Sequence, residues 1–370
     1  MGNKAFFYLI SICIATTLAA QTKEKQWMLG QFERPVNAQP VLQSDSTSYF
    51  VDPMTQKEAH WESMATFNPA AMVKGDSIYV LYRAEEKLGE KEIGGHRSRI
   101  GMAISADGSH FTKRSEPIFY PNNDDQKENE WPGGVEDPRI VQTEDGLYVL
   151  TYTQWNRKVP KLAVATSKDL VHWDKHGPAF KNHRDGLYLD RETKSGAIVT
   201  ELKNGKLVAA KINGSYWMYY GVPHIWLAHS TDLLHWTPLE THEDKLAPVL
   251  SPRPGYFDSW LVEAGPPPIL TDKGIVVLYN AGNSQAVGVK DLGNRVYTGG
   301  QALFDANEPW KLLDRTDQPF IKPELPFEKS GQYKDGTTFL EGLVWFKGAW
   351  YLYYGTADSM VGVVSSKKLN

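Results

Sequence analysis

An internal repeat is the feature of this chain that most restricts the folds open to it. A serine, an aspartate two residues later and an aromatic residue after a short gap recur at residues 105–111, 167–173 and 230–236. Successive copies begin 62 and 63 residues apart. Residues 305–310 form a looser copy, and residues 365–368 resemble the start of a fifth. A repeat of about 65 residues indicates one structural unit used several times along the chain.

A second phrase, a turn followed by a β-rich run, alternates with the first. Asn-Gly or Asp-Gly ahead of alternating apolar residues predicts a β-hairpin. No stretch keeps a 3.6-residue apolar period long enough for a large helix. The chain of 370 residues is therefore predicted to be all-β, as a five-bladed β-propeller with four-stranded blades around a channel. A two-sheet sandwich would explain the strands but not the repeat. The runs occupy residues 75–82, 145–152, 204–210, 272–279 and 347–354.

The first 20 residues have the pattern of a secretory signal peptide. Lys4 precedes a short apolar stretch that ends in small residues, and the chain then becomes polar at residue 21. We expect cleavage after Ala20, an exported periplasmic or secreted product, and one catalytic domain over residues 21–370. The single cysteine, Cys13, lies inside this segment, so the mature chain would have no disulfide or thiol site. Ile12, directly before it, argues against a lipid-anchored cysteine.

The net charge, and the apolar runs after the first 20 residues, restrict the kinds of partner that the protein can bind. The formal net charge is −4, which gives no electrostatic reason to expect nucleic acid. No later apolar run is long enough to insert into a membrane. Phosphate-binding glycine loops and His-Glu-x-x-His are absent from the sequence, so no cofactor and no metal site is predicted. The oligomeric state is left open.

One short segment stands out among the acidic residues as a candidate site. Residues 133–140 read Gly-Gly-Val-Glu-Asp-Pro-Arg-Ile. The two glycines free the backbone, and Pro138 is expected to push Asp137 towards an extended conformation. The segment would present Glu136, Asp137 and Arg139 in a stiff frame just before a strand. A salt bridge between blades is the alternative role for the glutamate and the arginine.

Three further glutamates have unusual surroundings. Glu263 precedes three consecutive prolines, which cannot lie in a central strand and form a stiff frame. Glu201 ends a segment that begins at Lys194 and leads into a hairpin turn, and Glu341 precedes an aromatic strand. Some tryptophans in loops are possible platforms for sugar rings, although most aromatic residues should pack the core. The candidates are Trp131, Trp155, Trp217 and Trp260.

Six short motifs along nearly the whole mature chain together resemble glycoside hydrolase family 130, the mannoside phosphorylases and mannosidases. The family fold is a five-bladed propeller, which agrees with the interpretation of the repeat. The motifs are Phe-Asn-Pro-Ala-Ala at 67–71, Tyr-Arg-Ala at 82–84, Ser-Arg-Ile-Gly at 98–101, Gly-Val-Glu-Asp-Pro-Arg at 134–139, Ala-Gly-Pro-Pro-Pro at 264–268 and Tyr-Gly-Thr-Ala-Asp at 354–358.

The resemblance implies roles for individual residues. Asp137 would be the proton donor and would act through a hydroxyl of the bound sugar. Other residues in the matching motifs would hold the sugar on the non-reducing side of the scissile bond, and Lys194 is added to this substrate-binding set. The predicted substrate-binding residues are Asn68, Arg83, Arg99, Arg139, Lys194 and Asp358.

This chain differs from the family's phosphorylases at positions that bind phosphate. The differences indicate that a group other than phosphate attacks the sugar. Lys211 follows Ala210 where phosphorylases have a His-Arg pair, and Asn280 replaces a phosphate-binding histidine. Glu263 stands where phosphorylases usually have glycine, and Glu341 where the residue is often small or neutral. Like charges about 4 Å apart repel by roughly 4 kcal/mol at an effective dielectric of 20, so added carboxylates disfavour phosphate. A carboxylate can instead take a proton from water in an inverting hydrolysis.

These observations predict an exported inverting β-mannosidase that releases mannose from the non-reducing ends of β-linked manno-oligosaccharides, with β-1,2 the favoured linkage. Glu263 ranks first as the base, followed by Glu201 and Glu341, and Glu201 is expected to help Glu263 to hold the water. The alternatives are a phosphorylase with a remodelled phosphate site and a carbohydrate-binding propeller without catalysis. A weaker alternative is a five-bladed glycosidase that acts on arabinans or fructans.

Overall fold

The computed structural model describes residues 25–89, 95–241, 243, 245–367 and 369. The predicted signal peptide at residues 1–20 lies outside this range. Strands dominate the described chain, and among its residues no helix has the length and apolar character needed to cross a membrane. The prediction of an all-β protein is confirmed. The described helical segments are short: α1 (Lys127–Glu130) and the 3₁₀ turns η1 (His183–Gly186), η2 (Lys290–Leu292) and η3 (Pro326–Glu328).

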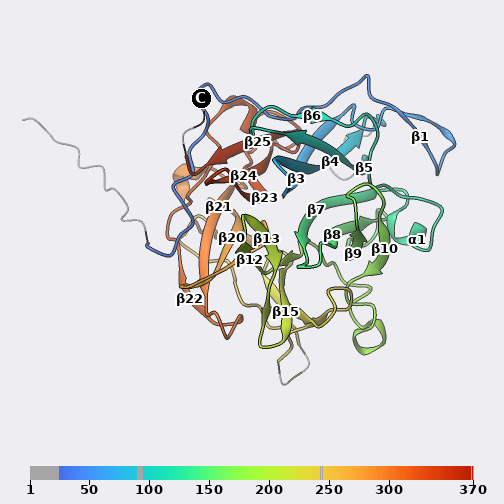
Figure 1. Cartoon of the computed structure of the whole chain (residues 1–370). Coiled ribbons are helices and arrows are strands. Elements are labelled where there is room, and N and C mark those ends of the chain that lie inside the picture. Colours follow the sequence, from blue (N-terminus) through green and yellow to red (C-terminus); the bar gives the residue numbers. More distant parts are fainter. Residues whose placement is uncertain (1–24, 90–94, 242, 244, 368, 370) are drawn as a thin grey trace, which may run out of the picture.

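The strands form five successive groups, and strands paired within a group are antiparallel. In Figure 1 the groups follow one another round the molecule, from blue and teal at the top through green and yellow to orange and red. Group 1 comprises β3 (Ala65–Lys74), β4 (Ser77–Glu86), β5 (Arg97–Ser105) and β6 (Thr112–Lys113). Group 2 comprises β7 (Gly134–Gln142), β8 (Tyr148–Trp155), β9 (Lys161–Ser167) and β10 (Asp174–Pro178).

Group 3 consists of seven short strands, whereas group 5 has only three among the described residues. A separate hairpin, β1 (Phe50–Asp52) and β2 (Lys57–Ala59), precedes group 1. Group 3 comprises β11 (Ala197–Ile198), β12 (Thr200–Lys203), β13 (Lys206–Ala209), β14 (Lys211–Ile212), β15 (Ser215–Tyr220), β16 (Trp226–Ser230) and β17 (Thr237–Pro238). Group 4 comprises β18 (Leu261–Ala264), β19 (Ile269–Thr271), β20 (Gly274–Gly282), β21 (Tyr297–Phe304) and β22 (Leu312–Arg315). Group 5 comprises β23 (Phe339–Phe346), β24 (Ala349–Thr356) and β25 (Met360–Ser365).

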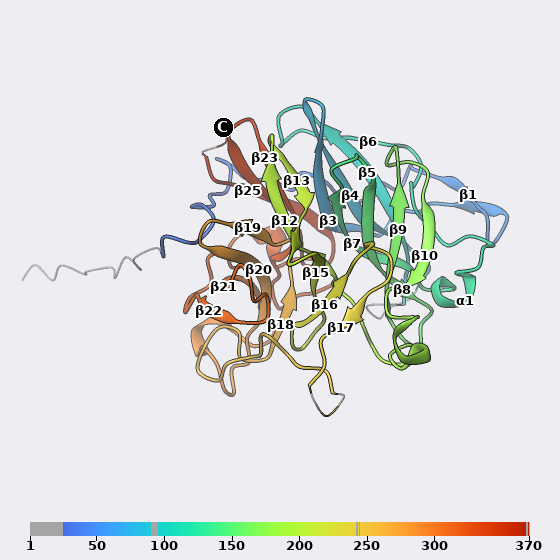
Figure 2. The same ribbon diagram turned by 60° about the horizontal axis from the view of Figure 1, so that its bottom comes forward.

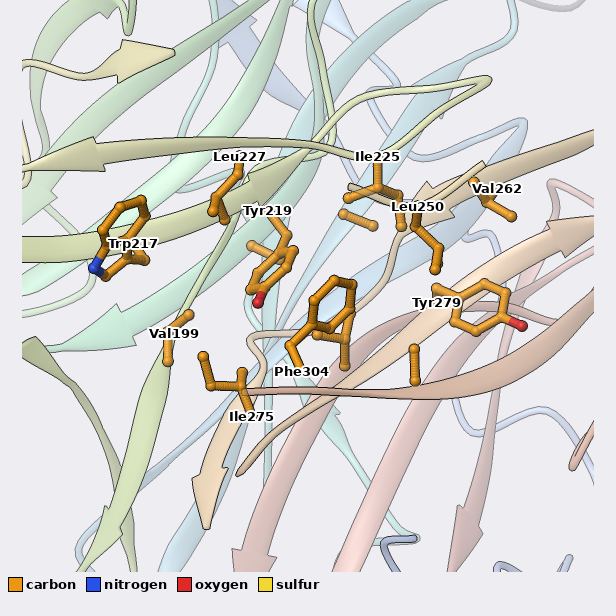
Figure 3. Packing of buried hydrophobic residues seen from close by; sticks show 14 of the residues in the cluster. Val199, Trp217, Tyr219, Ile225, Leu227, Leu250, Val262, Ile275, Tyr279 and Phe304 are labelled. Carbon is orange, nitrogen blue, oxygen red and sulfur yellow. The ribbon is translucent and has the colours of Figure 1, made fainter. Parts of the chain in front are cut away.

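The core of the described chain consists of five buried hydrophobic clusters, each shared by two groups. Groups 3 and 4 share the cluster in Figure 3, where Tyr219 lies beside Phe304. Groups 1 and 5 share another, in which Val80 and Tyr353 are both fully buried. The other three clusters join groups 1 and 2, groups 2 and 3, and groups 4 and 5. A sandwich would enclose a core between two layers, whereas here apolar surface is buried between successive groups. Closure into a five-bladed propeller stays a prediction.

Parallel pairing connects the first four groups. β5 pairs with β7, β7 with β13, and β12 with β19, each through one or two residue pairs. Figure 2 shows β12 and β13 side by side in the middle of the molecule. The segment before β1 runs along the last strand, because Glu33 pairs with Ser365 and Leu42 with Val361. The two ends of the described chain are therefore held together at group 5.

The repeated Ser-x-Asp phrase forms the hairpin turn between the last two strands of groups 1, 2 and 3. In the turn from β9 to β10, Ser167 Oγ accepts a hydrogen bond from the amide of Leu170. Asp169 Oδ1 accepts from the amides of Val171 and His172, and its Oδ2 lies 2.7 Å from Nδ1 of His172. Equivalent bonds occur in the copies at 105–110 and 230–235. The repeat is therefore a capped turn, and its histidines belong to the cap.

Candidate active site

A cavity of about 380 Å³ brings together residues from groups 1, 2, 4 and 5 and from the loop before group 3. This volume lies at the lower end of the range for ligand pockets. Six of the residues predicted to take part in catalysis or substrate binding line it: Asn68, Arg83, Asp137, Lys194, Glu263 and Asp358. Residues far apart in the sequence thus converge on one site.

Asp137 lies at an irregularity of β7, where the pairing with β8 shifts between Glu136 and Arg139. Its φ is +50°, so the backbone is left-handed and the prediction of an extended Asp137 was wrong. Asn68, which also precedes a proline and lies at a register shift, has a φ of +46°. Left-handed backbone at a non-glycine residue costs of order 1–3 kcal/mol. Surrounding contacts must therefore hold both residues in place.

Several hydrogen bonds fix Asp137. Its Oδ1 accepts from Asn68 Nδ2 at 2.8 Å and from Arg83 Nη1 at 3.1 Å. Its backbone carbonyl accepts from Arg139 Nη1 at 3.2 Å. The same arginine donates to the carbonyls of Ala264 at 2.8 Å and Gly265 at 2.9 Å. Arg139 therefore ties the Asp137 motif to the backbone directly after Glu263, and in this way it sets the position of both carboxylates.

Arg83 is shared by several buried carboxylates. Its Nη2 donates to Glu85 at 2.6 Å and to Glu136 at 2.9 Å, in addition to the bond from Nη1 to Asp137. Burial by itself would raise the pKa of Asp137, but Arg83 and Lys194 outweigh it and the pKa is lowered.

Two other carboxyl groups in the cavity have raised pKa values, in contrast to Asp137. Burial, with the repulsion of neighbouring carboxylates, raises the pKa of Glu136 and of Asp358 to about 7, although the charge of Arg83 opposes this. The carboxylates around Arg83 outnumber its single charge, so like-charge repulsion resists complete ionisation. Near neutral pH this cluster of carboxyl groups therefore retains a proton.

Glu263 lies on β18 and is only 2% exposed. Ser195 Oγ donates a hydrogen bond to its Oε1, and Lys194 Nζ lies 3.8 Å from the same oxygen. Ser195 has a φ of +58°, which is the left-handed conformation again. The nearby negative charge of Glu263 is the largest influence on Lys194 and raises its pKa. Glu263 is thus a buried, oriented carboxylate on the wall of the same cavity as Asp137.

The other two candidates for the base lie elsewhere. Glu201 borders a different pocket, where its Oε1 is 2.6 Å from Lys203 Nζ. Glu341 is fully buried outside the cavity lining, 3.0 Å from Nη1 of Arg139. Burial raises the pKa of Glu341 well above its usual value. The prediction that Glu201 holds the water with Glu263 is therefore corrected, because the two side chains face different pockets.

Two predicted substrate-binding arginines do not line the cavity. Arg99 is 1% exposed and forms ion pairs with Asp52 and, at 3.1 Å, with Glu86. Arg139 is also 1% exposed, and its guanidinium contacts backbone carbonyls and Glu341. We correct both assignments, because each guanidinium is occupied within the protein.

The positions that differ from phosphorylases add no cation to the cavity. Asn280 is fully buried, donates to the carbonyl of Leu340 at 3.1 Å and accepts from the amide of Leu340 at 2.6 Å. It joins β20 to β23. Lys211 borders the second pocket, with Nζ 4.9 Å from the centre of the Tyr216 ring.

Sequence reasoning missed several residues of the site. Glu85 follows Arg83 by two positions on β4, so the two share a face of the strand, and this spacing could have identified it. Gln332 donates to Glu85 and to the carbonyl of Asp358, both at 2.8 Å, but its loop carries no sequence signal. Among the four tryptophans proposed as platforms, Trp155 lines the cavity. The lining also includes Phe67, Thr153, Pro160, Arg295, Tyr297, Tyr333, Thr337 and Phe339.

Three buried polar atoms on the cavity wall have no hydrogen-bond partner within the described part of the chain. They are Asn68 Oδ1, Thr153 Oγ1 and Thr337 Oγ1. Buried polar groups are normally paired, and an unpaired one requires an explanation. All three are shielded from solvent within the wall.

Buried carboxylates, unpaired hydroxyls and aromatic walls in one cavity are the features of a saccharide-processing site. The chain belongs to glycoside hydrolase family 130, whose family model, described as β-1,4-mannooligosaccharide phosphorylase, matches residues 35–369. The resemblance inferred from the six motifs is confirmed.

Relatives of two kinds support this membership. A 1,2-β-oligomannan phosphorylase from Thermoanaerobacter sp. (strain X514) is 33% identical over 314 residues, 84% of this chain and 92% of the relative. The structure of a putative glycosidase from Bacteroides thetaiotaomicron is 51% identical, with a TM-score of 0.91 over 93% of this chain and 98% of that one. A second structure is 53% identical, with a TM-score of 0.91 over 93% of this chain and 95% of that one. It is described with family 130 glycoside hydrolases that target β-1,2-mannosidic linkages in Candida mannan.

Proposed function

We propose that this protein is an exported, inverting glycoside hydrolase that releases mannose from the non-reducing ends of β-1,2-linked manno-oligosaccharides. The observation that carries the proposal is the placement of Glu263. It shares the cavity with Asp137, accepts a hydrogen bond from Ser195, and lies 3.8 Å from Lys194. A buried carboxylate beside the proton donor suits the activation of water and not the binding of a phosphate anion.

The reaction is a single displacement. Glu263 takes a proton from a water molecule while the water oxygen bonds to the anomeric carbon. The bond from that carbon to the glycosidic oxygen breaks, and the oxygen receives a proton that Asp137 delivers through a hydroxyl of the bound sugar. The anomeric configuration is inverted, as expected when one carboxyl group acts as acid and another as base.

The proton that Asp137 delivers comes from the cluster of carboxyl groups around Arg83. Asp137 has a lowered pKa, whereas the pKa of Glu136, its neighbour in sequence, is raised to about 7. In closely interacting carboxyl groups the proton belongs to the group as a whole. A sugar that occupies the cavity and excludes water favours the neutral form of Asp137, with the proton taken from this cluster.

The sugar on the non-reducing side would lie against Asn68, Arg83 and Asp358. Arg83 presents a guanidinium held in place by its bonds to Glu85 and Glu136. The 53% identical structure, described with hydrolases of β-1,2-mannosidic linkages, supports this linkage for the substrate.

Two further parts of the proposal concern the fold and the location of the protein. We propose that the five groups are the blades of a closed propeller, supported by the clusters that join successive groups and also the first group with the last. Export rests on the signal-peptide pattern at residues 1–20. An exported hydrolase yields free mannose, whereas mannose 1-phosphate would be of little use outside the cytoplasm.

Phosphorolysis is the second candidate function. Two observations favour it: Lys194 and Arg295 are cations that line the cavity, and the 33% identical relative is a phosphorylase. Against it, Lys194 already faces Glu263 at 3.8 Å, so part of its charge is neutralised.

A product assay separates these functions. The purified protein is incubated with β-1,2-mannobiose, with and without inorganic phosphate, and mannose is separated from mannose 1-phosphate. We expect free mannose at a rate independent of phosphate, with the α-anomer formed first in the NMR spectrum. Mannose 1-phosphate formed only with phosphate would select the phosphorylase. The absence of product from mannobiose and longer β-mannosides, together with calorimetric binding, would select a carbohydrate-binding propeller.

A further inference from the structure

The cavity wall that carries Tyr297 continues outward as a row of aromatic rings. The Tyr297 ring lies 5.9 Å from that of Phe339, 5.5 Å from that of Tyr333 and 5.9 Å from that of Trp260. Phe339, Tyr297 and Tyr333 line the cavity, whereas Trp260 lies beyond the lining and is 37% exposed. The row therefore leads from the buried wall to the surface.

Arg295 places Trp260 at the mouth of the cavity. The side chain of Arg295 belongs to the lining, yet it is 56% exposed, so it marks the open side. Its guanidinium lies 5.2 Å from the Trp260 ring and 5.8 Å from the Tyr333 ring. The hydroxyl of Tyr333 donates to the backbone carbonyl of Arg295 at 2.7 Å. Trp260 and Arg295 thus form one ledge, with an aromatic face beside a cationic edge.

The ring of Trp260 is held in position by the backbone. The backbone amide of Trp260 donates a hydrogen bond to the carbonyl of Gly282 at 2.8 Å. A Cβ atom at Gly282 would lie only 2.7 Å from the Trp260 ring, so only glycine lets the ring pack this closely against β20. Trp260 also directly precedes β18, the strand that carries Glu263. The ledge is therefore held in fixed relation to the proposed base.

We propose that Trp260 is a stacking platform for a sugar ring beyond the first one on the reducing side of the scissile bond, so that chains of three or more β-linked mannose units bind better than the disaccharide. This inference rests on the proposed function, which places the non-reducing mannose deep in the cavity, against Asn68, Asp137 and Asp358. The rest of the chain must then leave through the mouth. The apolar face of a sugar packs on the tryptophan ring, and the guanidinium of Arg295 can donate to its hydroxyls.

The test compares substrates of two lengths. The ratio of kcat/KM for β-1,2-mannotetraose to that for β-1,2-mannobiose is measured for the wild type, Trp260→Ala, Trp260→Phe and Trp310→Ala. Trp310 is a matched control, because it is 43% exposed and lies on the loop before β22. We expect Trp260→Ala to lower the ratio about tenfold, equivalent to about 1.4 kcal/mol, mainly through KM. Trp260→Phe should retain most of the ratio, and Trp310→Ala should leave it unchanged. An unchanged ratio in Trp260→Ala would overturn the platform.

A binding experiment separates failure of this inference from failure of the proposed function. Calorimetric titration of β-1,2-mannotetraose into Asp137→Asn is compared with titration into the double variant that also carries Trp260→Ala. A loss of about tenfold in affinity would support the platform even if the wild type cleaved neither substrate, in which case the proposed hydrolysis alone would fail. Equal affinities would overturn the platform whatever the catalytic result.

Discussion

Aspartates at two kinds of left-handed turn have opposite surroundings in this protein. At the hairpin between β9 and β10, Asp169 is half exposed, and its oxygens accept from backbone amides and from His172. Leu170, directly after it, has a φ of +77°. At the cavity, Asp137 itself is left-handed, 7% exposed and surrounded by charged groups from other parts of the chain.

The difference lies in how far away the stabilising partners are in the sequence. Every hydrogen bond described for the Asp169 carboxylate comes from within three residues, so the same turn can be used in several groups. Asp137 depends on Asn68 and Arg83, which are 69 and 54 residues away. A repeated aspartate with local partners serves the fold, whereas a single aspartate with distant partners and strained backbone indicates a functional site.

The largest expected difference is in kcat, between a variant of the cavity aspartate and a variant of the hairpin aspartate. Asp137→Asn should lower kcat by about 10³- to 10⁴-fold, because loss of a general acid typically costs up to this range. Asp169→Asn should change kcat less than about twofold, since it lies outside the cavity. Steady-state kinetics on β-1,2-mannobiose measure both, and circular dichroism checks the fold. Wild-type rates in Asp137→Asn would remove it as the donor.

Substitution of one glutamate in the cavity and one in the second pocket tests which of the two regions carries the base. Glu263→Gln should lower kcat by about 10²- to 10³-fold, because the amide cannot take a proton from water. Glu201→Gln is the matched control, since Glu201 contacts Lys203 at a different pocket, and its kcat should stay close to that of the wild type. A greater loss in Glu201→Gln than in Glu263→Gln would reverse our assignment of the base.

The pH profile tests whether the cluster around Arg83 shares a proton. The pKa of Glu136 is raised to about 7, so kcat/KM should fall above about pH 7 as the shared proton is lost. Glu136→Gln removes a carboxylate whose repulsion makes Asp137 easier to protonate, and this fall should move to lower pH by about one unit. A profile identical to that of the wild type would exclude Glu136 from the proton supply.

The same variant has a predicted effect on stability. A carboxyl group whose pKa is higher in the folded state destabilises the fold as pH rises from its unfolded value, near 4.5, through about 7. Glu136→Gln should therefore raise Tm at pH 8 by a few degrees and change it little at pH 4. Glu243→Gln, at a side chain that is 75% exposed, should not show this difference. Equal shifts at both pH values would contradict the buried charge cluster.

The smallest effect is expected at the repeated turn. Asp169→Ala removes the acceptor for the amides of Val171 and His172 and should cost about 1 kcal/mol of unfolding free energy, as loss of a comparable cap does. Hydrogen bonds from His172 and from the backbone lower the pKa of Asp169, so its contribution is present above pH 4 and is lost as pH falls further. Urea denaturation at pH 7 and pH 3 measures both. A loss above about 3 kcal/mol would mean that the turn is more than a local cap.

The hairpins could be predicted because their signals are local. Asn-Gly and Asp-Gly turns and the Ser-x-Asp caps act over a few residues, so the sequence predicted both the all-β class and the unit that repeats. Asp137 and Glu263 could be singled out for a similar reason, since each is next to glycines or prolines that restrict the backbone. Local chemistry also led to one error, because Pro138 alone would favour an extended Asp137, whereas contacts from Asn68 and Arg83 hold it left-handed.

What the sequence determined by itself is the five β-rich runs, the repeated Ser-x-Asp phrase and a short set of carboxylates and arginines with unusual neighbours. Only the tertiary structure decided which of them meet. It placed Glu263 in the cavity and Glu201 in another pocket, and it buried Arg99 and Arg139 in internal contacts while it brought Glu85 and Gln332 to the site. The physical reason is that a turn depends on neighbours in sequence. A site assembled from several strand groups depends instead on the register and direction of strands that are far apart in the chain.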